Sequence, residues 1–398
     1  MSTQTKKIIR NLGNGLILRH ASPEDGEALG SFFGEQLGDG GLTSRDGQGL
    51  VAMTRDLFSR SHVSLSPNDF TIVEETSSGR IVSAMCLIQQ TWMYEGIEFG
   101  FGRPEYVATH PDFRKRGLVR TQFDTVHQWS AENGLMVQGI TGIPYFYRQF
   151  GYEFALNLGG RRCGSVLPKP KEGESEKFVL RPAEEKDIPF LMSVYEQGCR
   201  RSMVSAKWTY EHWHNNLYEM SADNIQRLEF RVIERAETHE PVGYLAHPGS
   251  LTISGAYAFH YEVKSGVSWL EVSPFVSRYL WNVGQEYAKA ENKVCESFGF
   301  YLGESHPAYQ ALGNISRCKT RLQGTYEWLS GKPAAAQEWW KKSLAEAERM
   351  GLRYDIGEIH LEIGTRLNEC EHLEKAESVF AGIGDGLELA KTRDLLGR

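Results

Sequence analysis

The sequence of 398 residues has few cysteines, and no two of them stand close together. The six are Cys86, Cys163, Cys199, Cys295, Cys318 and Cys370. The sequence contains no CxxC pair and no Cys/His cluster, and its twelve histidines show no ligand spacing. We therefore expect no metal site. Scattered free thiols are typical of proteins in a reducing cytoplasm, which is the location that we expect.

The sequence also lacks long apolar runs and a positive net charge. No apolar run is long enough to span a bilayer, and residues 1–10 lack the apolar core of a signal peptide. We therefore expect no membrane partner. The net charge of −7 argues against general nucleic-acid binding, so we expect no nucleic-acid partner either.

A basic turn that contains a glycine is the most informative feature that is present. Residues 106–108 predict a strand, the turn Arg114-Lys115-Arg116-Gly117 follows, and a helical pattern runs on to residue 134. Free N–H groups and the positive dipole end at a helix N-terminus attract anions, and Arg120 adds a further charge. A solvated basic helix start is the alternative interpretation. Basic residues at this end oppose the helix dipole, and a bound phosphate or pyrophosphate would remove that conflict.

Other elements of the first half follow from periodicity and from turn residues. Ser22 predicts a helix N-cap with Pro23 in the first turn, and the glycine-rich residues 38–49 predict a loop that covers something. Residues 135–140 predict a strand, and residues 145–154 predict a short helix that returns as a strand. Two strands joined by a short turn make a predicted hairpin at residues 70–74 and 81–90.

The sequence repeats its own beginning after a charged linker at residues 168–177. Residues 178–187 match residues 16–25 at Leu, Arg, Ala and Asp, and a second predicted hairpin follows. We match Trp269–Pro274 to Tyr106–Pro111, after which no basic glycine turn occurs in the second copy. The second copy is therefore predicted to keep the fold and to lose the phosphate site.

Helical spacing dominates the end of the chain. The predicted helices are residues 334–350, 354–367, 372–380 and 387–396. Helices of this length with short turns are typical of antiparallel pairs, and the alternation of small and aromatic residues resembles tetratricopeptide-type repeats. Two repeats are too few for a stable solenoid. We therefore expect the tail, through Trp339 and Trp340, to pack on the preceding domain or on a second subunit.

The basic turn and a segment downstream resemble the two motifs of the GCN5-related N-acetyltransferases (GNAT). The acetyl-CoA motif of that family is Arg/Gln-x-x-Gly-x-Gly/Ala, which this sequence matches at Arg114 and Gly117 and leaves at Val119. Residues 146–153, Phe-Tyr-Arg-Gln-Phe-Gly-Tyr-Glu, look like the family segment Phe-Tyr-x-x-x-Gly-Phe/Tyr-Glu. The resemblance covers roughly residues 16–165.

The resemblance implies a mixed sheet whose fourth and fifth strands splay apart around acetyl-CoA. The pyrophosphate would meet the N–H groups of the basic turn, and backbone donors near two residues of the fourth strand would meet the acetyl carbonyl. The binding residues implied in this way are Val107, Thr109, Arg114, Lys115, Arg116, Gly117, Leu118 and Val119.

The resemblance also implies a general acid and leaves the general base open. Tyr147 occupies the family's usual acid position, although a core aromatic is the alternative interpretation. Glu105 is the candidate base, because the strand period places it on the face of Val107 and Thr109 unless a bulge changes the phase. A surface carboxylate is the alternative for Glu105, and ordered water or His110 are other candidate bases.

We therefore expect an α/β (α+β) protein with two GNAT-like mixed-sheet domains in tandem, followed by an all-α tail. The expected domains are residues 16–165 (active), 178–330 (degenerate) and 332–398 (tetratricopeptide-like). The expected function is acetyl transfer from acetyl-CoA, as co-substrate, to a primary amine of a small molecule or a protein. The alternative is a non-catalytic acyl-CoA sensor that acts through the tail, which can contact a protein partner or a second subunit.

Overall fold

A computed structural model describes most of the chain. The described residues are 7–59, 62–143, 145–156, 160–164, 175–252, 254–303, 305–312, 316–317, 319–350, 353–383 and 385–398. Two compact units share the chain: the first unit is Met1–Asn157 with Glu184–Arg227, and the second is Leu158–Ala183 with Leu228–Arg398. Residues 168–174 of the predicted linker lie outside the described residues. The compact units cut the chain differently from the predicted domains, because residues 184–227 group with the first unit.

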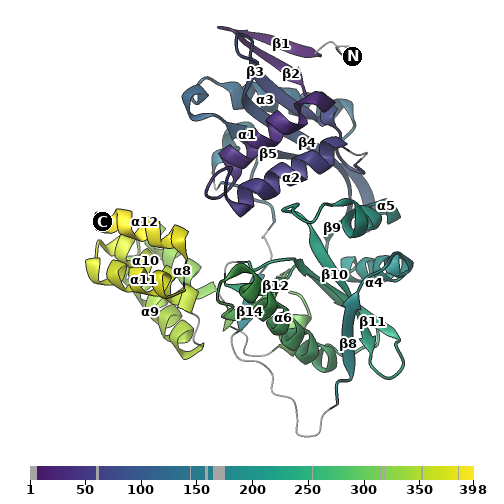
Figure 1. The fold of residues 1–398 in the computed structure, drawn as a ribbon, viewed down its shortest axis with the longest axis vertical. Helices are drawn as coiled ribbons and strands as arrows, with labels where there is room; N and C mark the ends of the chain where they lie inside the picture. The colour runs from purple at the N-terminus through teal and green to yellow at the C-terminus, as the bar shows by residue number, and fades with distance from the viewer. Residues whose placement is uncertain are drawn as a thin grey trace. The chain divides into compact units, whose positions relative to one another are not determined.

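The first unit is built on one seven-stranded sheet (Figure 1). Its strands are β1 (Ile8–Gly13), β2 (Leu16–His20), β3 (Phe70–Glu75), β4 (Arg80–Tyr94), β5 (Ile97–Thr109), β6 (Val137–Gln138) and β9 (Val204–Ala206). The order is β1-β2-β3-β4-β5-β6, and β9 pairs with the end of β4. All pairs are antiparallel except β5 with β6. The predicted hairpin is confirmed as β3 and β4.

Helices cover both faces of this sheet because residues along β4 alternate between two cores. Ala84 and Cys86 face the core beneath α1 (Gly26–Leu37) and α2 (Arg45–Ser59). Met85 and Leu87 face the core beneath α3 (Leu118–Glu132). Successive side chains of a strand point to opposite faces, so both cores are built from the same strand.

The start of α1 and the start of α2 test two predictions from the sequence. A 3-10 turn, η1 (Pro23–Asp25), precedes α1, with Ser22 as its N-cap in a capping box and Pro23 in the first turn, as predicted. The prediction of a loop through residues 38–49 was wrong in its second half, because α2 begins at Arg45. The burial of Gly47 and Gly49 against neighbouring backbone explains the glycines there as close-packing positions.

Two predictions for the segment after α3 were partly wrong. The strand expected at residues 135–140 is β6, which has two residues only. The short helix is present as η4 (Phe146–Phe150), and it ends at Gly151 in a left-handed conformation (φ 91°). The described residues 152–156 then form no strand. The next strand, β7 (Gly160–Gly164), pairs in the second unit instead.

The first unit also contains a segment from later in the chain. Its elements are η5 (Glu185–Asp187), α4 (Ile188–Cys199), α5 (Tyr210–His214) and η6 (Asn215–Glu219). The Asp56 carboxylate on α2 accepts hydrogen bonds from the Ser221 backbone N–H (2.8 Å) and from Asn224 Nδ2 (2.8 Å). These bonds hold the end of the segment against α2.

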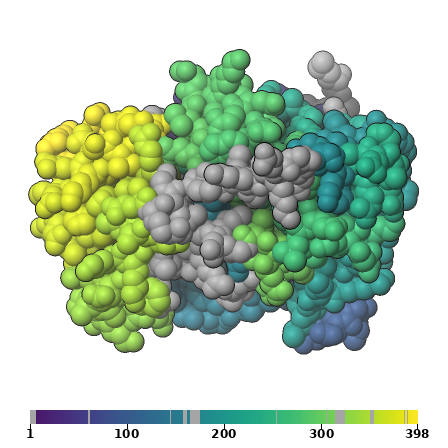
Figure 2. Space-filling model, turned by 90° about the horizontal axis from the view of Figure 1, so that it is seen from below, coloured from purple at the N-terminus to yellow at the C-terminus, as the bar shows by residue number. Residues whose placement is uncertain are grey.

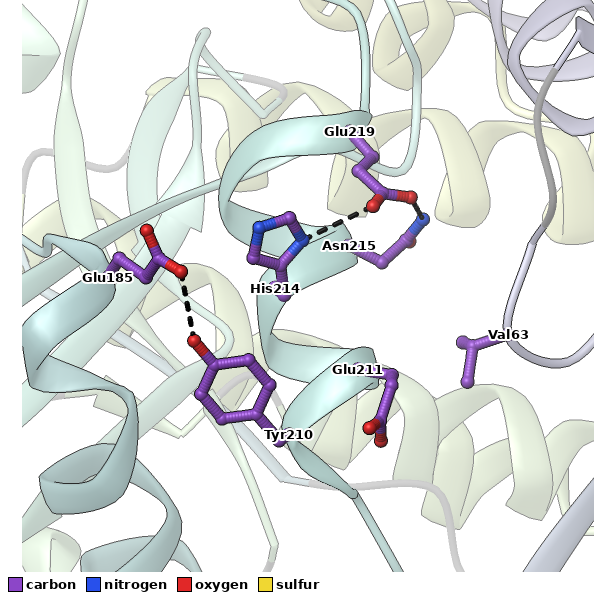
Figure 3. Close-up of a pocket in the computed structure, with 7 residues that line it drawn as sticks. All are labelled: Val63, Glu185, Tyr210, Glu211, His214, Asn215 and Glu219. Atoms are coloured by element: carbon purple, nitrogen blue, oxygen red, sulfur yellow. Dashed lines mark hydrogen bonds and ion pairs between the residues drawn. The ribbon is translucent and has the colours of Figure 1, made fainter.

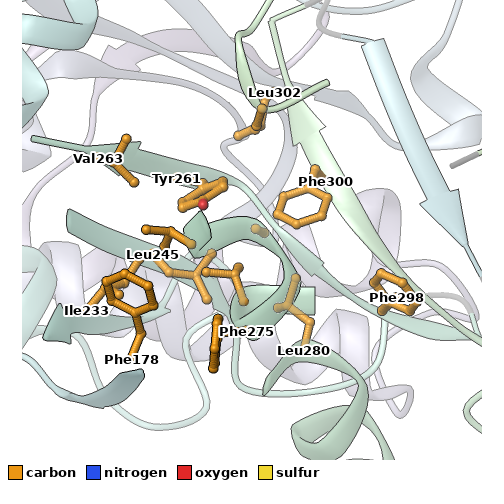
Figure 4. Close-up of a cluster of buried hydrophobic side chains, with 14 of the residues drawn as sticks. Phe178, Ile233, Leu245, Tyr261, Val263, Phe275, Leu280, Phe298, Phe300 and Leu302 are labelled. Atoms are coloured by element: carbon orange, nitrogen blue, oxygen red, sulfur yellow. The ribbon is translucent and has the colours of Figure 1, made fainter. Parts of the chain in front are cut away.

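The second unit contains two four-stranded sheets. The first has the order β13 (His260–Val263), β11 (Pro241–Pro248), β10 (Leu228–Arg235) and β8 (Phe178–Pro182). The second has the order β12 (Gly255–Ala258), β14 (Ser297–Leu302), β7 and β15 (Ser316–Arg317). Only Phe259 separates β12 from β13, so one bent segment contributes to both sheets. The long helix α6 (Trp269–Glu291) and the short α7 (Ala308–Ala311) complete the core shown in Figure 4.

The repeat in the sequence corresponds to a repeated structural feature. Arg19 of β2 pairs with Glu74 of β3 (2.7 Å), and Arg181 of β8 pairs with Glu234 of β10 (2.8 Å). In both copies of the repeat a capping-box turn follows the arginine strand and leads into a helix, although η5 and α4 of the second copy group with the first unit. The matched Leu, Arg, Ala and Asp positions therefore reflect the same strand-turn-helix unit.

The match of Trp269–Pro274 to a strand was wrong, because these residues form the start of α6. Buried Val272, Val276 and Leu280 recur at the spacing of one helix face, and Pro274 stands inside the helix. The turn before α6 is Lys264–Ser268, where Gly266 has a left-handed conformation (φ 82°). A glycine turn is therefore present, but its single cation, Lys264, lies 3.2 Å from Glu240.

The helical tail is confirmed and has one more helix than predicted. Its helices are α8 (Lys319–Leu329), α9 (Pro333–Met350), α10 (Arg353–Leu367), α11 (Cys370–Ile383) and α12 (Gly386–Leu396). In Figure 2 the last of these, in yellow, form a compact block. Trp340 is fully buried in a cluster with Tyr257 and Cys163, so the tail packs on the sheet β12-β14-β7-β15. Its likeness to tetratricopeptide repeats stays a prediction.

Candidate functional site

Strand β5 loses its partner on one side halfway along its length. It pairs with β4 from end to end, but its parallel pairing with β6 consists of Phe101 with Val137 and Gly102 with Gln138. From residue 103 to residue 109 this edge of β5 has no strand partner within the described part of the chain. The fourth and fifth strands of the predicted sheet therefore separate, as a wedge-shaped site requires.

A β-bulge interrupts β5 beside this open edge. Tyr106 has a left-handed backbone (φ 55°), and the register shifts so that Met85 of β4 faces both Tyr106 and Val107. The Tyr106 ring lies 5.6 Å from Phe33 on the α1 side. Val107 instead packs in the core beneath α3. A bulge of this kind turns backbone groups away from the ladder, where a ligand can reach them.

A buried polar network fixes the end of β5. The Ser83 hydroxyl lies 2.8 Å from Thr109 Oγ1 and donates to Gln122 Oε1 (2.6 Å), and Gln122 Nε2 donates to Thr71 Oγ1 (2.9 Å). Ser83, Gln122 and Thr71 are fully buried. The network ties three strands to α3 and so sets the position of the turn that follows Thr109. No local pattern in the sequence predicts this network, because its members are far apart in the chain.

The turn between β5 and α3 presents its backbone to solvent. Lys115 (φ 61°) and Gly117 (φ 75°) both have left-handed conformations. A Cβ added to Gly117 would meet nothing within 4 Å, so the glycine serves the backbone conformation and leaves the approach open. The Arg114 guanidinium donates to Thr109 O (3.3 Å), and that of Arg116 donates to Asp112 O (2.9 Å). These bonds steady the two side chains at the turn.

The N-terminus of α3 begins in this turn with free donors. Its first backbone hydrogen bond runs from Thr121 N–H to Gly117 O (3.1 Å), and the N–H groups of Leu118 and Val119 have no acceptor among the described residues. The Leu118 side chain is buried, and that of Val119 packs in the core beneath α3. The larger side chain at position 119 therefore points into the protein and leaves its N–H available, despite the departure from the family motif.

Arg120 has a different position from the other cations of the turn. Its guanidinium donates to the Gln149 backbone carbonyl (3.3 Å) and to Gln149 Oε1 (3.2 Å), and it lies 5.2 Å from the centre of the Phe150 ring. Arg120 therefore connects α3 to η4. This contact links the turn to the segment that carries Tyr147.

Tyr147 is half-buried and borders both a core and the open edge of β5. Its ring packs edge-on against Phe123 (5.9 Å) and Phe146 (5.1 Å). Burial raises the pKa of Tyr147 above its usual value, and the charge of Glu105 adds to that increase. Among the described residues its hydroxyl has no hydrogen-bond partner. The phenol therefore stays protonated at neutral pH and its proton is not already shared.

Glu105 lies where the bulge, and not the simple strand period, places it. It stands opposite Cys86, whose side chain faces the core beneath α1 and α2, so the bulge puts Glu105 and Val107 on opposite faces. Its carboxylate accepts from Arg103 Nε (2.7 Å) and from Thr141 Oγ1 (3.3 Å) and is one-fifth exposed. Arg103 and Thr141, which the sequence did not single out, therefore orient this carboxylate.

His110 is committed to the turn itself. Its Nδ1 accepts a hydrogen bond from the Asp112 backbone N–H (3.3 Å), as the N-cap of η3 (Pro111–Phe113). Its ring lies edge-on to Phe113 (6.1 Å). A histidine held in this way shapes the turn and is poorly placed to accept a proton from a substrate.

The described residues contain no group of three His, Cys, Asp or Glu side chains that could hold a metal ion. No helix among them is both long and apolar enough to cross a membrane.

Comparison with protein families gives one match, which includes the site. Residues 49–155 match the model of the acetyltransferase (GNAT) domain. This range contains β5, the basic turn, α3 and Tyr147. The comparison with curated proteins gave no match.

Solved structures resemble the chain over most of its length. N-myristoyltransferase of Saccharomyces cerevisiae with bound myristoyl-CoA has a TM-score of 0.50 at 12% identity, covering 73% of this chain and 77% of that one. A GCN5-related N-acetyltransferase from Kribbella flavida has a TM-score of 0.49 at 16% identity, covering 74% of this chain and 66% of that one. A GCN5-related N-acetyltransferase from Anabaena variabilis has a TM-score of 0.49 at 13% identity, covering 76% of this chain and 69% of that one. The likeness to N-myristoyltransferase is one of fold alone. The elements of the structure itself confirm the α+β class with a helical tail.

Proposed function

We propose that the first unit is an N-acetyltransferase that moves the acetyl group of acetyl-CoA to a primary amine. The observation that supports this most strongly is the continuity between the turn of free N–H groups and the open edge of β5. The turn suits a pyrophosphate, and the open edge gives the rest of an extended acyl-CoA a place beside the bulge. The match of residues 49–155 to the GNAT acetyltransferase domain supports the same assignment.

The cofactor-binding residues divide by the groups that they offer. Lys115, Gly117, Leu118 and Val119 offer backbone N–H groups, and Arg114 and Arg116 add positive charge beside them. Val107 and Thr109 border the open edge and offer backbone donors to the acetyl carbonyl. Their positions are set by the bulge and by the buried network of Ser83 and Gln122.

The reaction forms one covalent bond and breaks another. The neutral amine attacks the thioester carbonyl carbon, the C–N bond forms, and the C–S bond then breaks to release the CoA thiolate. Backbone donors at the bulge stabilise the oxyanion that forms between these events. Glu105 takes the proton that the amine nitrogen loses, and Tyr147 donates a proton to the thiolate.

The raised pKa of Tyr147 bears on its role as the acid. A phenol whose pKa is raised above its usual value holds its proton at neutral pH, so the acid form is present there. The CoA thiol is a stronger acid than this phenol, so proton donation from Tyr147 to the thiolate is uphill by pKa alone and depends on charge placement at the site. The nearby Glu105 carboxylate would become neutral by taking the amine proton, which makes this donation easier.

The acceptor and the role of the tail belong to the same proposal. The amine is that of a small molecule or a protein, and its contacts would include residues 38–44 of the loop before α2. The helical tail would contact a protein partner or a second subunit. A cytoplasmic location fits the free cysteines, of which Cys86, Cys163 and Cys295 are buried.

A CoA-release assay over a panel of primary amines tests the proposal. We expect turnover with acetyl-CoA, and Tyr147→Phe should lower kcat by about 100-fold while the Kd for acetyl-CoA stays within a factor of two. Octanoyl-CoA should be a poorer donor than acetyl-CoA. The double variant Arg114→Ala/Arg116→Ala should weaken acetyl-CoA binding in calorimetry.

Three outcomes would contradict parts of this proposal. Binding of acetyl-CoA without CoA release across the panel would favour the acyl-CoA sensor. An unchanged kcat in Tyr147→Phe would remove Tyr147 as the acid. Absence of acetyl-CoA binding would exclude both the enzyme and the sensor.

A further inference from the structure

The first unit contains a cavity of about 450 Å³ that none of the residues assigned above lines (Figure 3). Its wall comes from Glu185 of η5, from α5, from η6 and from Val63 in the segment before β3. Neither β5, nor the basic turn, nor η4 contributes to it. The cavity is therefore separate from the proposed acetyl-CoA site.

Among the residues that the structure describes, the wall of the cavity is acidic and contains no Lys or Arg. Glu185, Glu211 and Glu219 line it. The nearest basic neighbour in sequence, Lys186, lies 2.6 Å from Glu184 instead. A concave surface that carries charges of one sign concentrates ligands of the opposite sign.

Asn215 adds an acceptor that lacks a donor. The residue is only 7% exposed, and its Nδ2 donates to Glu219 Oε2 (3.1 Å). Its Oδ1 accepts no hydrogen bond from any residue that the structure describes, although the side chain lines the cavity. Asn215 Oδ1 is not one of the fully buried polar atoms without a partner, so it can be reached from the cavity. This atom is therefore available to a ligand that donates hydrogen bonds.

Two stacked aromatic rings, those of Tyr210 and His214, also line the cavity. The rings of Tyr210 and His214 stack with centres 6.3 Å apart at an angle of 24°. The Tyr210 hydroxyl donates to Glu185 (3.1 Å), and the His214 ring lies 3.2 Å from Glu219. Each ring is therefore held beside a carboxylate, and ring faces beside carboxylates attract organic cations.

The backbone at the cavity departs from an ordinary helix. Residues Asn215–Glu219 form a π-helical turn directly after α5. Such turns are rare and occur often at functional sites, because the wider turn moves side chains out of the regular helical positions. Here the turn brings Glu219 back onto both His214 and Asn215 (Figure 3).

We propose that this cavity binds a small organic ammonium ion, with the carboxylates of Glu185, Glu211 and Glu219 as counter-charges and Asn215 Oδ1 as an acceptor. The ammonium group supplies both the positive charge and the N–H donors that the wall lacks. The cavity volume fits a short aliphatic diamine. This site does not depend on the proposed acetyl transfer, since it shares no residue with it.

Calorimetry with the full chain tests the proposal, with 1,4-diaminobutane as the probe and 1,4-butanediol as its neutral counterpart. We expect the diamine to bind with a Kd below about 1 mM at low salt. Butanediol should give no binding heat. The double variant Glu185→Gln/Glu211→Gln should raise the diamine Kd by at least tenfold, and Asn215→Leu should also raise it. Added salt should weaken binding, because the attraction is largely between charges.

Matched controls separate this cavity from other amine sites. Glu24→Gln/Glu132→Gln removes two exposed carboxylates elsewhere in the unit and should leave the diamine Kd unchanged. Tyr147→Phe should leave the diamine Kd unchanged too. If the diamine instead bound as acetyl acceptor beside Tyr147, the cavity variants would not change its Kd. The double variant at the cavity should keep its circular dichroism spectrum and its acetyl-CoA affinity. No heat with the diamine, equal binding of butanediol, or an unchanged Kd in the Glu185→Gln/Glu211→Gln variant would overturn the proposal.

Discussion

At the scale of single residues, the strongest constraint on the proposed site is the backbone of the turn before α3. Gly117 has two roles: its left-handed backbone shapes the turn, and it is the N-cap of α3. Position 119 shows the opposite case, since a larger residue is tolerated where its side chain packs inward. A motif position is therefore restrictive when the ligand needs the backbone conformation and permissive when the side chain has somewhere else to go.

Gly117→Ala should weaken acetyl-CoA binding more than it lowers stability. An alanine in the left-handed region costs about 1 kcal/mol, and relief of that strain would rotate the N–H groups that face the pyrophosphate. We expect a rise of roughly 5- to 30-fold in the Kd for acetyl-CoA, measured by calorimetry.

The matched control for this change is Gly79→Ala. Gly79 also has a left-handed backbone (φ 71°) and open space around its Cα, but it lies in the turn between β3 and β4. It should show the same small loss in thermal stability with no change in acetyl-CoA affinity. Equal effects of the two substitutions on affinity would mean that the turn at Gly117 does not hold the ligand.

At the scale of elements, periodicity in the sequence was a good guide wherever one face of an element is buried. Strands β2 and β3, helices α1 and α3, and four helices of the tail follow from it directly. Periodicity failed where burial is nearly complete or nearly absent. The first turns of α2 carry small, closely packed glycines that resemble a loop, and β6 is too short to show alternation.

The site shows a similar division between local and distant information. The basic turn and Tyr147 are visible in the sequence because the residues of each motif are neighbours in the chain. The bulge at Tyr106 is not visible, and it alone reverses the expected face of Glu105. The partners that orient Glu105, and the network of Ser83 and Gln122, come from separate strands, so no local pattern announces them.

A histidine pair in the tail gives a prediction about two of its helices. His360 of α10 and His372 of α11 have their Nδ1 atoms 2.8 Å apart, and His360 is 6% exposed. Burial, together with the charges of His372 and Lys375, lowers the pKa of His360 to about 4, while the charge of Glu371 opposes this shift. Glu369 lies 3.7 Å from the other ring, that of His372.

The stability of the tail should therefore fall as the pH drops from about 6.5 to about 4. In this window the unfolded chain binds a proton at His360 with its ordinary pKa near 6.5, whereas the folded chain does not. The free energy of unfolding should decrease by roughly 2 kcal/mol over the window and stay constant for this group above pH 7. Urea unfolding, followed by the fluorescence of the buried Trp340, measures the change.

Substitution isolates the contribution of this histidine from those of others with lowered pKa values. His360→Gln should flatten the pH dependence of the Trp340 transition. The exposed His239→Asn should leave it as in the natural chain. A natural chain and a His360→Gln variant with the same dependence between pH 4 and 6.5 would show that the pair does not control tail stability.

At the scale of the whole molecule, the two copies of the sequence repeat share a strand-turn-helix start, but the sheets that follow differ in whether the wedge beside the last strands stays open. In the second unit β12 and β14 pair in parallel, and β13 continues beyond them as β5 continues beyond β6. There the space between β13 and β14 is filled by side chains. Tyr261 lies 5.6 Å from Phe300, and both belong to the core shown in Figure 4. Trp269 packs against this core with its ring 5.0 Å from Tyr261.

This difference predicts that one chain binds one molecule of acetyl-CoA. A ligand in the second unit would have to displace buried aromatic side chains, and burying each such side chain contributes about 2 kcal/mol that would be lost. The turn before α6 also offers only Lys264, which is already paired with Glu240. Calorimetric titration of the full chain should therefore give a stoichiometry near one per chain.

The double variant Arg114→Ala/Arg116→Ala decides which unit holds that molecule. If the first unit holds it, the variant should lose most of the binding heat, whereas Lys264→Ala should leave Kd and stoichiometry unchanged. A stoichiometry near two, or heat that survives the arginine variant and disappears with Lys264→Ala, would assign a site to the second unit. The aromatic filling of its wedge would then have to rearrange on binding, and quenching of Trp269 fluorescence by the ligand would report that rearrangement.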